Sequence, residues 1–328
     1  MKRLALAVML PGLMLACPCA FAQVRASGDL GLETVAPTPA APPARLGGYI
    51  QFRETDVQPT GLTATLNRAR LSGDGTLPWR FSYRVLVEYQ AASGPRTPST
   101  VSLREAYARW AYWPVAFTFG QNKVPFSREY LVPVTSLETA DLSTVVDSLA
   151  PKYDIGITGE CAISAYGSFA VGVYNGEGQN ASLNRDSTVL WVSRLTLHPV
   201  SQLSVAGNVA YYSQDSTRYG ADASLEQSGA VLRGEVIGMR KSGRARDDFG
   251  WYTLAGFRPI PLIQLVCKLE DFQRPSLGQA RRISAITGGL NLDLPGGRTR
   301  LIVNEVARKS GYPRVKRNSF IAQLQVRF

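Results

Sequence analysis

From Leu46 to the end of the chain, apolar and polar residues alternate in segments of about ten residues. The segment 79–90 has the clearest alternation. Its odd positions are all apolar or aromatic: Trp79, Phe81, Tyr83, Val85, Val87 and Tyr89. Its even positions are almost all polar: Arg80, Ser82, Arg84, Leu86, Glu88 and Gln90. Successive side chains of a strand point to opposite faces, so the pattern predicts strands with one apolar face and one polar face.

The connections between these segments fall into two classes by length. Tight turns rich in Pro or Gly are predicted at 74–78, 112–114, 164–167, 198–201, 226–229, 258–261 and 295–297. Longer polar connections are predicted at 55–61, 91–100, 123–152, 175–187, 213–218, 241–248, 273–282 and 307–318. Because the classes alternate, short connections share one rim and long ones the other, as in barrels with short periplasmic turns and longer external loops.

Seven turns and eight loops join sixteen antiparallel strands, an even number that closes a sheet without leaving an edge in lipid. The competing fold is a large secreted protein built of two β-sandwiches. An apolar face on nearly every strand, with no matching second face, favours the barrel. The fold class is therefore all-β, a transmembrane antiparallel barrel of about 16 strands over residues 46–328, and the chain ends on the aromatic Phe328.

The first 22 residues have the pattern of an export signal. Lys2 and Arg3 precede an uncharged apolar run, and the small-x-small tripeptide 20–22 precedes Gln23. We expect Sec export and cleavage after Ala22; the alternative is a lipoprotein signal that carries its lipid on Cys17. Residues 23–45 are rich in Pro and Ala, which predicts an extended periplasmic tail.

The chain is basic, with 36 Lys and Arg against 25 Asp and Glu and a formal net charge of +11. Removal of the signal would leave +9. A basic balance fits nucleic acid, an anionic membrane surface or anionic solutes. Export excludes nucleic acid as a partner and leaves the other two.

Nothing in the sequence indicates catalysis. His198 is the only histidine, and its place beside Pro199 predicts a turn residue. The chain has no Walker A loop, no G-x-S-x-G or H-E-x-x-H motif and no zinc or iron spacing. We therefore expect no enzyme, no cofactor and no metal site.

Two cysteines would remain after signal cleavage, Cys161 and Cys267. Strand counting places them on the sixth and thirteenth strands, facing lipid. Ladder steps of roughly 4.8 Å separate them far beyond the limit of about 7 Å for a disulfide. Both are predicted to be free thiols.

The polar faces direct many charges into the lumen. The predicted lumenal basic residues are Arg68, Arg70, Arg80, Arg84, Arg109, Arg194, Arg233, Lys268, Arg300 and Arg327. The predicted lumenal acids are Glu88, Glu105, Asp222, Glu235, Glu270 and Asp293. Spacing within single strands predicts four wall pairs: Arg84 with Glu88, Arg109 with Glu105, Arg233 with Glu235 and Lys268 with Glu270.

The predicted turn at 74–78 places Arg70 near Arg80 and Arg68 near Arg84. Like charges that face one another across a ladder cost stability, so this cluster suggests a bound or passing anion. The alternative is a set of solvated arginines in a wide pore.

Four segments, in order along the chain, resemble the phosphate-selective porin O and P family. They are Asn67-Arg68-Ala69-Arg70-Leu71, the G-Q-x-K-x-P-F-S segment 120–127, Tyr174-Asn175-Gly176-Glu177-Gly178 and the closing segment 323–328. The match runs from about residue 46 to 328. The G-Q-x-K-x-P-F-S segment is its most specific part.

The resemblance implies a trimeric porin of a Gram-negative outer membrane, with a third loop that folds inward and a basic pore for phosphate or related anions. Lys123 matches the motif lysine, and Arg68 and Arg70 match the strand-two arginines. The expected partners are small anionic solutes, outer-membrane lipid with lipopolysaccharide, and two further copies of the chain. The candidate pore-lining and anion-binding residues are Arg68, Arg70, Arg80, Arg84, Lys123, Arg109 and Arg194.

Two other functions remain open from the sequence. A cation-selective or unselective diffusion porin would share every strand without depending on the arginine cluster. A non-channel barrel would use basic loops such as 314–317 for adhesion or for binding lipopolysaccharide. Its lumen would be plugged by residues 123–152.

Overall fold

The computed structural model describes residues 44–91, 99–184, 187–213, 215–244, 246–275, 281–311 and 315–328. The predicted signal peptide 1–22 and nearly all of the predicted tail 23–45 lie outside the described residues. Among the described residues, no helix has the length and apolar character needed to cross a membrane.

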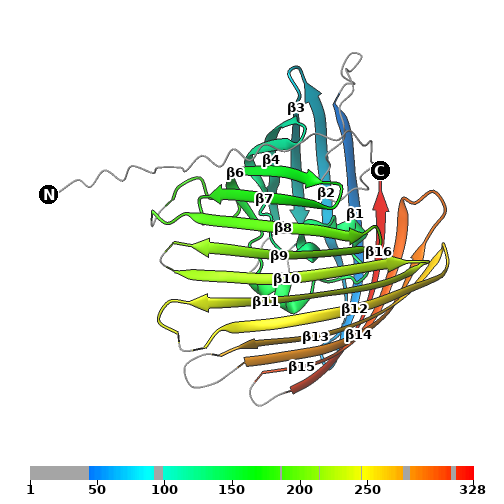
Figure 1. The fold of residues 1–328 in the computed structure, drawn as a ribbon. Coiled ribbons are helices and arrows are strands. Elements are labelled where there is room, and N and C mark those ends of the chain that lie inside the picture. The colour runs from blue at the N-terminus through cyan, green and yellow to red at the C-terminus, as the bar shows by residue number, and fades with distance from the viewer. Residues whose placement is uncertain are drawn as a thin grey trace.

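Sixteen strands form one closed sheet in which every strand pairs antiparallel with its chain neighbours and β1 pairs with β16 (Figure 1). The first half comprises β1 (Arg45–Val57), β2 (Gly61–Leu77), β3 (Phe81–Gln90), β4 (Thr100–Tyr112), β5 (Val115–Lys123), β6 (Tyr153–Ser164), β7 (Gly167–Tyr174) and β8 (Leu190–Val200). The second half comprises β9 (Leu203–Tyr212), β10 (Ser216–Gln227), β11 (Ala230–Lys241), β12 (Asp248–Ile260), β13 (Ile263–Arg274), β14 (Arg281–Asp293), β15 (Thr299–Ser310) and β16 (Val315–Arg327). The predicted antiparallel barrel is confirmed.

Three predicted turns, at 74–78, 198–201 and 258–261, are placed too early in the chain. The β2–β3 hairpin turns at 78–80 rather than at 74–78, so Trp79 and Arg80 lie in the turn, with φ of 60° and 68°. Strand β2 continues through Gly75, which pairs with Tyr83, whose ring lies where a Cβ at Gly75 would be. At the predicted turn 198–201, His198 belongs to β8 and its backbone N–H donates to the carbonyl of Tyr166 at 2.7 Å. At the predicted turn 258–261, residues 258–260 belong to β12.

Strand alternation sorts side chains between lipid and lumen. Exposed apolar residues mark the outward register, for example Phe117 and Phe119 on β5 and Leu265 on β13. The two cysteines are free, with Cys161 on β6 and Cys267 on β13 as predicted.

Two β-bulges break the alternation and change what faces the lumen. In the β1–β2 ladder, Gln51 pairs with Arg68 but the next residue pairs with Leu66, which leaves Asn67 as the extra residue. In the β3–β4 ladder, Arg104 is the extra residue between two paired neighbours. A bulge turns two successive side chains to one face. The extra residues Asn67 and Arg104 therefore reach the lumen beside Arg68 and Glu105.

The long connection after β5 folds into the barrel, where it forms α1 (Arg128–Leu131), the 3-10 helix η1 (Val134–Ser136) and α2 (Thr144–Leu149) (Figure 1). We call residues 124–152 the inward segment. Its buried apolar side chains pack on apolar side chains of the inner wall in one cluster: Val124, Phe126, Val145, Val146, Leu149, Ala150, Tyr174, Leu190, Val192, Ala210, Ile237, Tyr252, Leu254 and Phe272. The prediction of an almost wholly polar inner face is thus wrong for this part of the wall, because protein rather than water covers it.

The β4–β5 ladder ends at the pair Ala106–Gln121, although β4 continues above it. Side-chain amides bind the carbonyls that β5 leaves unpaired. Gln121 Nε2 donates to the carbonyls of Leu103 and Arg104 at 2.7 and 3.1 Å, and Gln179 Nε2 donates to that of Leu103 at 2.9 Å. The loop between β7 and β8 thereby closes the wall at this seam.

Candidate functional site

Three arginines surround one carboxylate on the inner face of β2–β4. Arg70 and Arg104 both contact Glu88, and the Arg68 Nε lies 3.8 Å from Glu88 Oε2. Glu88 is 1% exposed and the Arg70 side chain 8%, whereas those of Arg68 and Arg104 are 27% and 23% exposed. One negative charge cannot neutralise three positive ones, so Glu88 and its three arginines keep a formal surplus of two, which Arg68 and Arg104 present to the lumen next to a formal charge of −1 on the ion-pair group of Arg84 with its two acids. We call Glu88 and its three arginines the Glu88 cluster.

The predicted arginine cluster is wrong in two of its members. The observed register pairs Arg70 with Glu88 and Arg84 with Asp74, so neither arginine faces another across this hairpin. Arg84 forms ion pairs of 2.6 Å with Asp74 and Glu105. Arg80 lies in the turn at the short-connection rim, with its guanidinium 4.1 Å from the centre of the Tyr112 ring.

Most predicted wall pairs take other partners. Across-strand neighbours are closer than residues two positions apart on one strand, so carboxylates on adjacent strands or on the inward segment prevail. Lys268 and Glu270 do lie together, at 3.9 Å. The other observed pairs are Arg109 with Glu160 at 2.7 Å, Arg194 with Asp222 at 2.6 Å, Arg233 with Glu138 and Glu226, and Arg300 and Arg258 with Asp293.

Lys123 does not face open solvent. Its Nζ donates to the carbonyls of Tyr130, Leu131 and Val132 at 2.7, 3.0 and 2.9 Å. These carbonyls end α1, where a cation is electrostatically favourable. The lysine thus fixes the start of the inward segment.

Charged side chains of β1 and β13 hold the rest of the inward segment. Arg53 forms an ion pair of 2.8 Å with Asp141, and Lys268 Nζ donates to the Asp141 carbonyl at 3.0 Å. Glu270 caps the start of α2 by accepting from the backbone N–H and the hydroxyl of Thr144 at 3.1 and 2.7 Å. Basic residues of β1 and β13 are therefore used to position this segment.

Within the inward segment, Glu129 is buried and accepts from the backbone N–H and hydroxyl of Ser143 at 2.9 and 2.8 Å. Burial raises the pKa of the Glu129 carboxyl, and the positive charge of Lys268 opposes the rise. Burial likewise raises the pKa of Tyr130 well above its usual range.

Tyrosines complete the surroundings of the Glu88 cluster. The Arg70 guanidinium lies 5.6 Å from the Tyr49 ring centre, and that of Arg104 lies 5.9 Å from Tyr153. Tyr153 in turn packs edge-on against Tyr130 of the inward segment, at 5.8 Å between ring centres. The inward segment thus lies beside the arginines of β2–β4, and together they make one basic and aromatic lining.

Sequence reasoning missed Arg104 and the tyrosines. A signal for Arg104 exists in the chain: the outward residues Val101 and Leu103 are at odd positions, whereas Ala106 and Trp110 are at even ones. Such a change of phase marks an extra residue between them.

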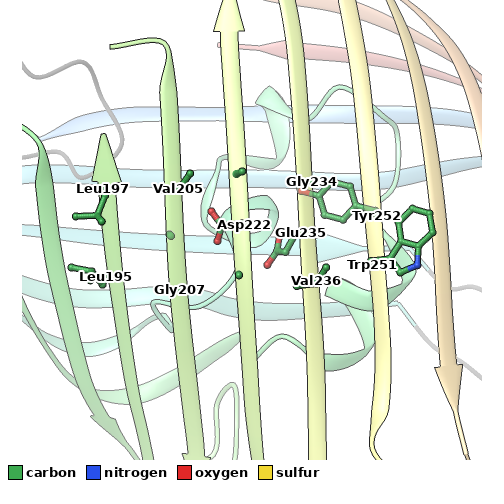
Figure 2. Close-up of a pocket in the computed structure, with 13 residues that line it drawn as sticks. Leu195, Leu197, Val205, Gly207, Asp222, Gly234, Glu235, Val236, Trp251 and Tyr252 are labelled. Atoms are coloured by element: carbon green, nitrogen blue, oxygen red, sulfur yellow. The ribbon is translucent and has the colours of Figure 1, made fainter. Parts of the chain in front are cut away.

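A separate depression of 610 Å³ lies at the wall of β8–β12 (Figure 2). Its exposed lining residues are apolar and belong to the outward register, such as Leu195, Val236 and Trp251. Asp222 and Glu235, which Figure 2 shows on neighbouring strands, pair across the ladder on the inner register. In the described part of the chain, no group of three or more His, Cys, Asp or Glu is arranged to hold a metal ion.

Comparisons with known proteins agree with this geometry. The model of the family "phosphate-selective porin O and P" matches residues 47–253. A comparison with curated protein sequences finds no match.

Solved structures share the barrel fold at low sequence identity. The anion-selective porin from Comamonas acidovorans is 13% identical, with a TM-score of 0.63 over 87% of this chain and 99% of that one. The outer membrane channel DcaP of Acinetobacter baumannii is 14% identical, with a TM-score of 0.64 over 87% and 97% of the two chains. The trimer form of OmpT from Vibrio cholerae is 9% identical, with a TM-score of 0.62 over 87% and 99%.

Proposed function

Because the chain belongs to the phosphate-selective porin O and P family, we propose that this outer-membrane channel is selective for small anions, phosphate or related oxyanions among them. The observation that carries the proposal is the surplus of positive charge in the Glu88 cluster. Arg68 and Arg104 are its two solvent-accessible members.

The cluster biases permeation without trapping the ion. One arginine about 4 Å from an ion contributes only about 1 kcal/mol in bulk water, and more where protein displaces water. Two accessible arginines, one on β2 and one on β4 with β3 between them, add their fields within a Debye length of about 10 Å at 0.1 M salt. A multivalent anion is attracted more strongly than chloride yet can still leave, which diffusion through a selective pore requires.

The assembly and export of the chain are part of the same proposal. We infer a homotrimer in the Gram-negative outer membrane, reached by Sec export with removal of residues 1–22. The trimer form of the similar OmpT barrel supports the oligomer. The basic and apolar N-terminal pattern supports the export route.

The test is the zero-current potential of single channels in a KCl gradient. Wild type should prefer chloride at low salt and lose this preference as salt rises. The double substitution Arg68→Gln and Arg104→Gln should move the potential toward that of potassium. Arg70 and Lys123 are poor choices for the test, because one is buried against Glu88 and the other holds α1.

Arg80→Gln is the matched control, since it removes one arginine charge at the turn rim outside the lumen. It should leave the potential unchanged. A wild-type channel without ion preference would favour the unselective porin. A folded barrel without conductance would favour a lumen plugged by the inward segment.

A further inference from the structure

The external end of the β15–β16 hairpin places like charges opposite one another. Arg308 pairs with Arg317, and Lys309 pairs with Lys316. All four residues are exposed. None has an acidic partner among the described residues. Directly opposed like charges destabilise an antiparallel pair, so the hairpin needs a negative charge that the described chain does not supply.

Alternation along the two strands decides where the lysines point. On β16, Phe320, Leu324 and Val326 are exposed at even positions, and Lys316 continues that outward register. Lys309 is opposite Lys316 and beside Ser284 of β14. We call the cross-strand pair Lys309–Lys316 the lysine rung. It faces away from the lumen and is therefore separate from the Glu88 cluster.

The height of the rung matches the head groups of the surrounding lipid. Ile286 is 56% exposed and pairs with Ala307, which marks apolar wall at this position. Lys309 lies two residues further toward the external rim, about 7 Å along the strand. The two lysines thus lie on the external side of Ile286, the last exposed apolar residue of β14, at the level that we assign to phosphorylated head groups.

Neighbouring acids do not neutralise the rung. Glu305 faces outward on the same strand, but it is four residues from Lys309, about 13 Å along the strand. On β14 the outward Arg282 forms a 2.8 Å ion pair with Asp271, so that acid is already engaged.

We propose that Lys309 and Lys316 form a binding site for the phosphate group of a phosphorylated glycolipid in the outer leaflet. Two ammonium groups on one rung can bind one dianionic phosphate from two sides. Basic residues at an anionic membrane surface strengthen binding about fivefold each, so the pair should contribute roughly thirtyfold. Arg308 and Arg317 lie on the inward register and add positive field from the mouth of the barrel.

The test uses the full-length protein purified in neutral detergent. Binding of bis-phosphorylated lipid A, of dephosphorylated lipid A and of inorganic phosphate is measured by native mass spectrometry. The variant carries Lys309→Gln and Lys316→Gln. The control carries Arg240→Gln and Lys241→Gln on the same rim, where both residues have acidic partners, at 3.1 Å from Asp247 and 3.2 Å from Asp215.

The variant should bind bis-phosphorylated lipid A roughly thirtyfold more weakly, and the control should stay within about twofold of wild type. Dephosphorylated lipid A should not distinguish the three proteins. Equal losses in variant and control, or no loss in the variant, would overturn the site. Displacement of the lipid by an equal concentration of inorganic phosphate would overturn its assignment to a lipid.

A stability measurement separates binding from folding. In detergent without lipid A, the variant should resist unfolding in SDS at least as long as wild type, because a repulsive rung has been removed. With lipid A present, wild type should gain more than the variant. A variant that unfolds faster in plain detergent would show that the lysines stabilise the barrel internally, and the proposal would fail whatever the channel conducts.

Discussion

Replacing Glu88 by glutamine should make the channel more anion-selective and the barrel less stable. The substitution removes the only carboxylate of the Glu88 cluster, so its formal surplus rises from two positive charges to three. An ion about 10 Å away in water feels a change of about 0.4 kcal/mol. Because the change has opposite sign for chloride and potassium, their permeability ratio should shift about fourfold in favour of chloride.

The loss of stability follows from burial. Glu88 and Arg70 are 1% and 8% exposed, and removing one partner of a buried ion pair costs about 3 kcal/mol or more. Glutamine keeps one acceptor oxygen, so the lower end of that range applies. If the pair forms late in folding, about 3 kcal/mol speeds unfolding about a hundredfold.

Two assays check the two effects. Zero-current potentials are recorded in KCl gradients near 10 mM and near 1 M, where the Debye length falls from about 30 Å to about 3 Å. The lifetime of the folded band is followed in SDS gels. Glu54→Gln is the control, because this exposed carboxyl faces outward on β1. A potential that stays unmoved at low salt, or that shifts equally in the control, would refute the electrostatic reasoning.

Three further outcomes follow from the structure. Mass spectrometry of the unreduced protein should find Cys161 and Cys267 as free thiols, and a disulfide between them would contradict the strand order. Lys123→Met should free the end of α1 and increase open-channel current noise, whereas a quiet channel would show that the three carbonyl contacts do not hold the inward segment. Since burial raises the pKa of Glu129, the folded state binds its proton more tightly than the unfolded chain, and stability should fall as pH rises from the ordinary glutamate range through the raised pKa. Unfolding lifetimes in SDS should therefore lengthen on acidification, and Glu129→Gln, which stays neutral and shares the shape, should lose that part of the pH dependence while Ser143 remains in contact.

The strand order could be predicted because a period of two survives along most of the wall. The prediction fails where a bulge adds one residue, and where a side chain packs on a turn-like sequence so that the strand continues through it. Asp74-Gly75 has the composition of a hairpin turn, yet the ring of Tyr83 occupies the space at Gly75 and the strand continues. Because the turn lies at 78–80 instead of 74–78, Arg80 is in the turn and not in the lumen, where it was predicted.

The site was less accessible to sequence reasoning than the fold. Partners across a ladder depend on register, so the pairing of Arg70 with Glu88 could not be read from spacing within one strand. The burial of Leu190 and Val192 could not be read either, because an apolar residue facing a packed loop has the same pattern as one facing lipid. The inward position of Arg104 could have been predicted, because the apolar residues of β4 shift from odd to even positions along the sequence.

The inward segment also has a mechanical consequence. The wall of a tube made of one sheet has no direct contact across its own bore. Here the inward segment contacts two distant strands of the wall. Arg218 on β10 donates to the Leu149 carbonyl at 2.8 Å, and Arg53 on β1 forms a 2.8 Å ion pair with Asp141. We expect contacts on two sides of the wall to resist a change of the cross-section when the surrounding membrane is compressed or stretched. The size limit for solutes then becomes a property of the chain rather than of the membrane in which it sits.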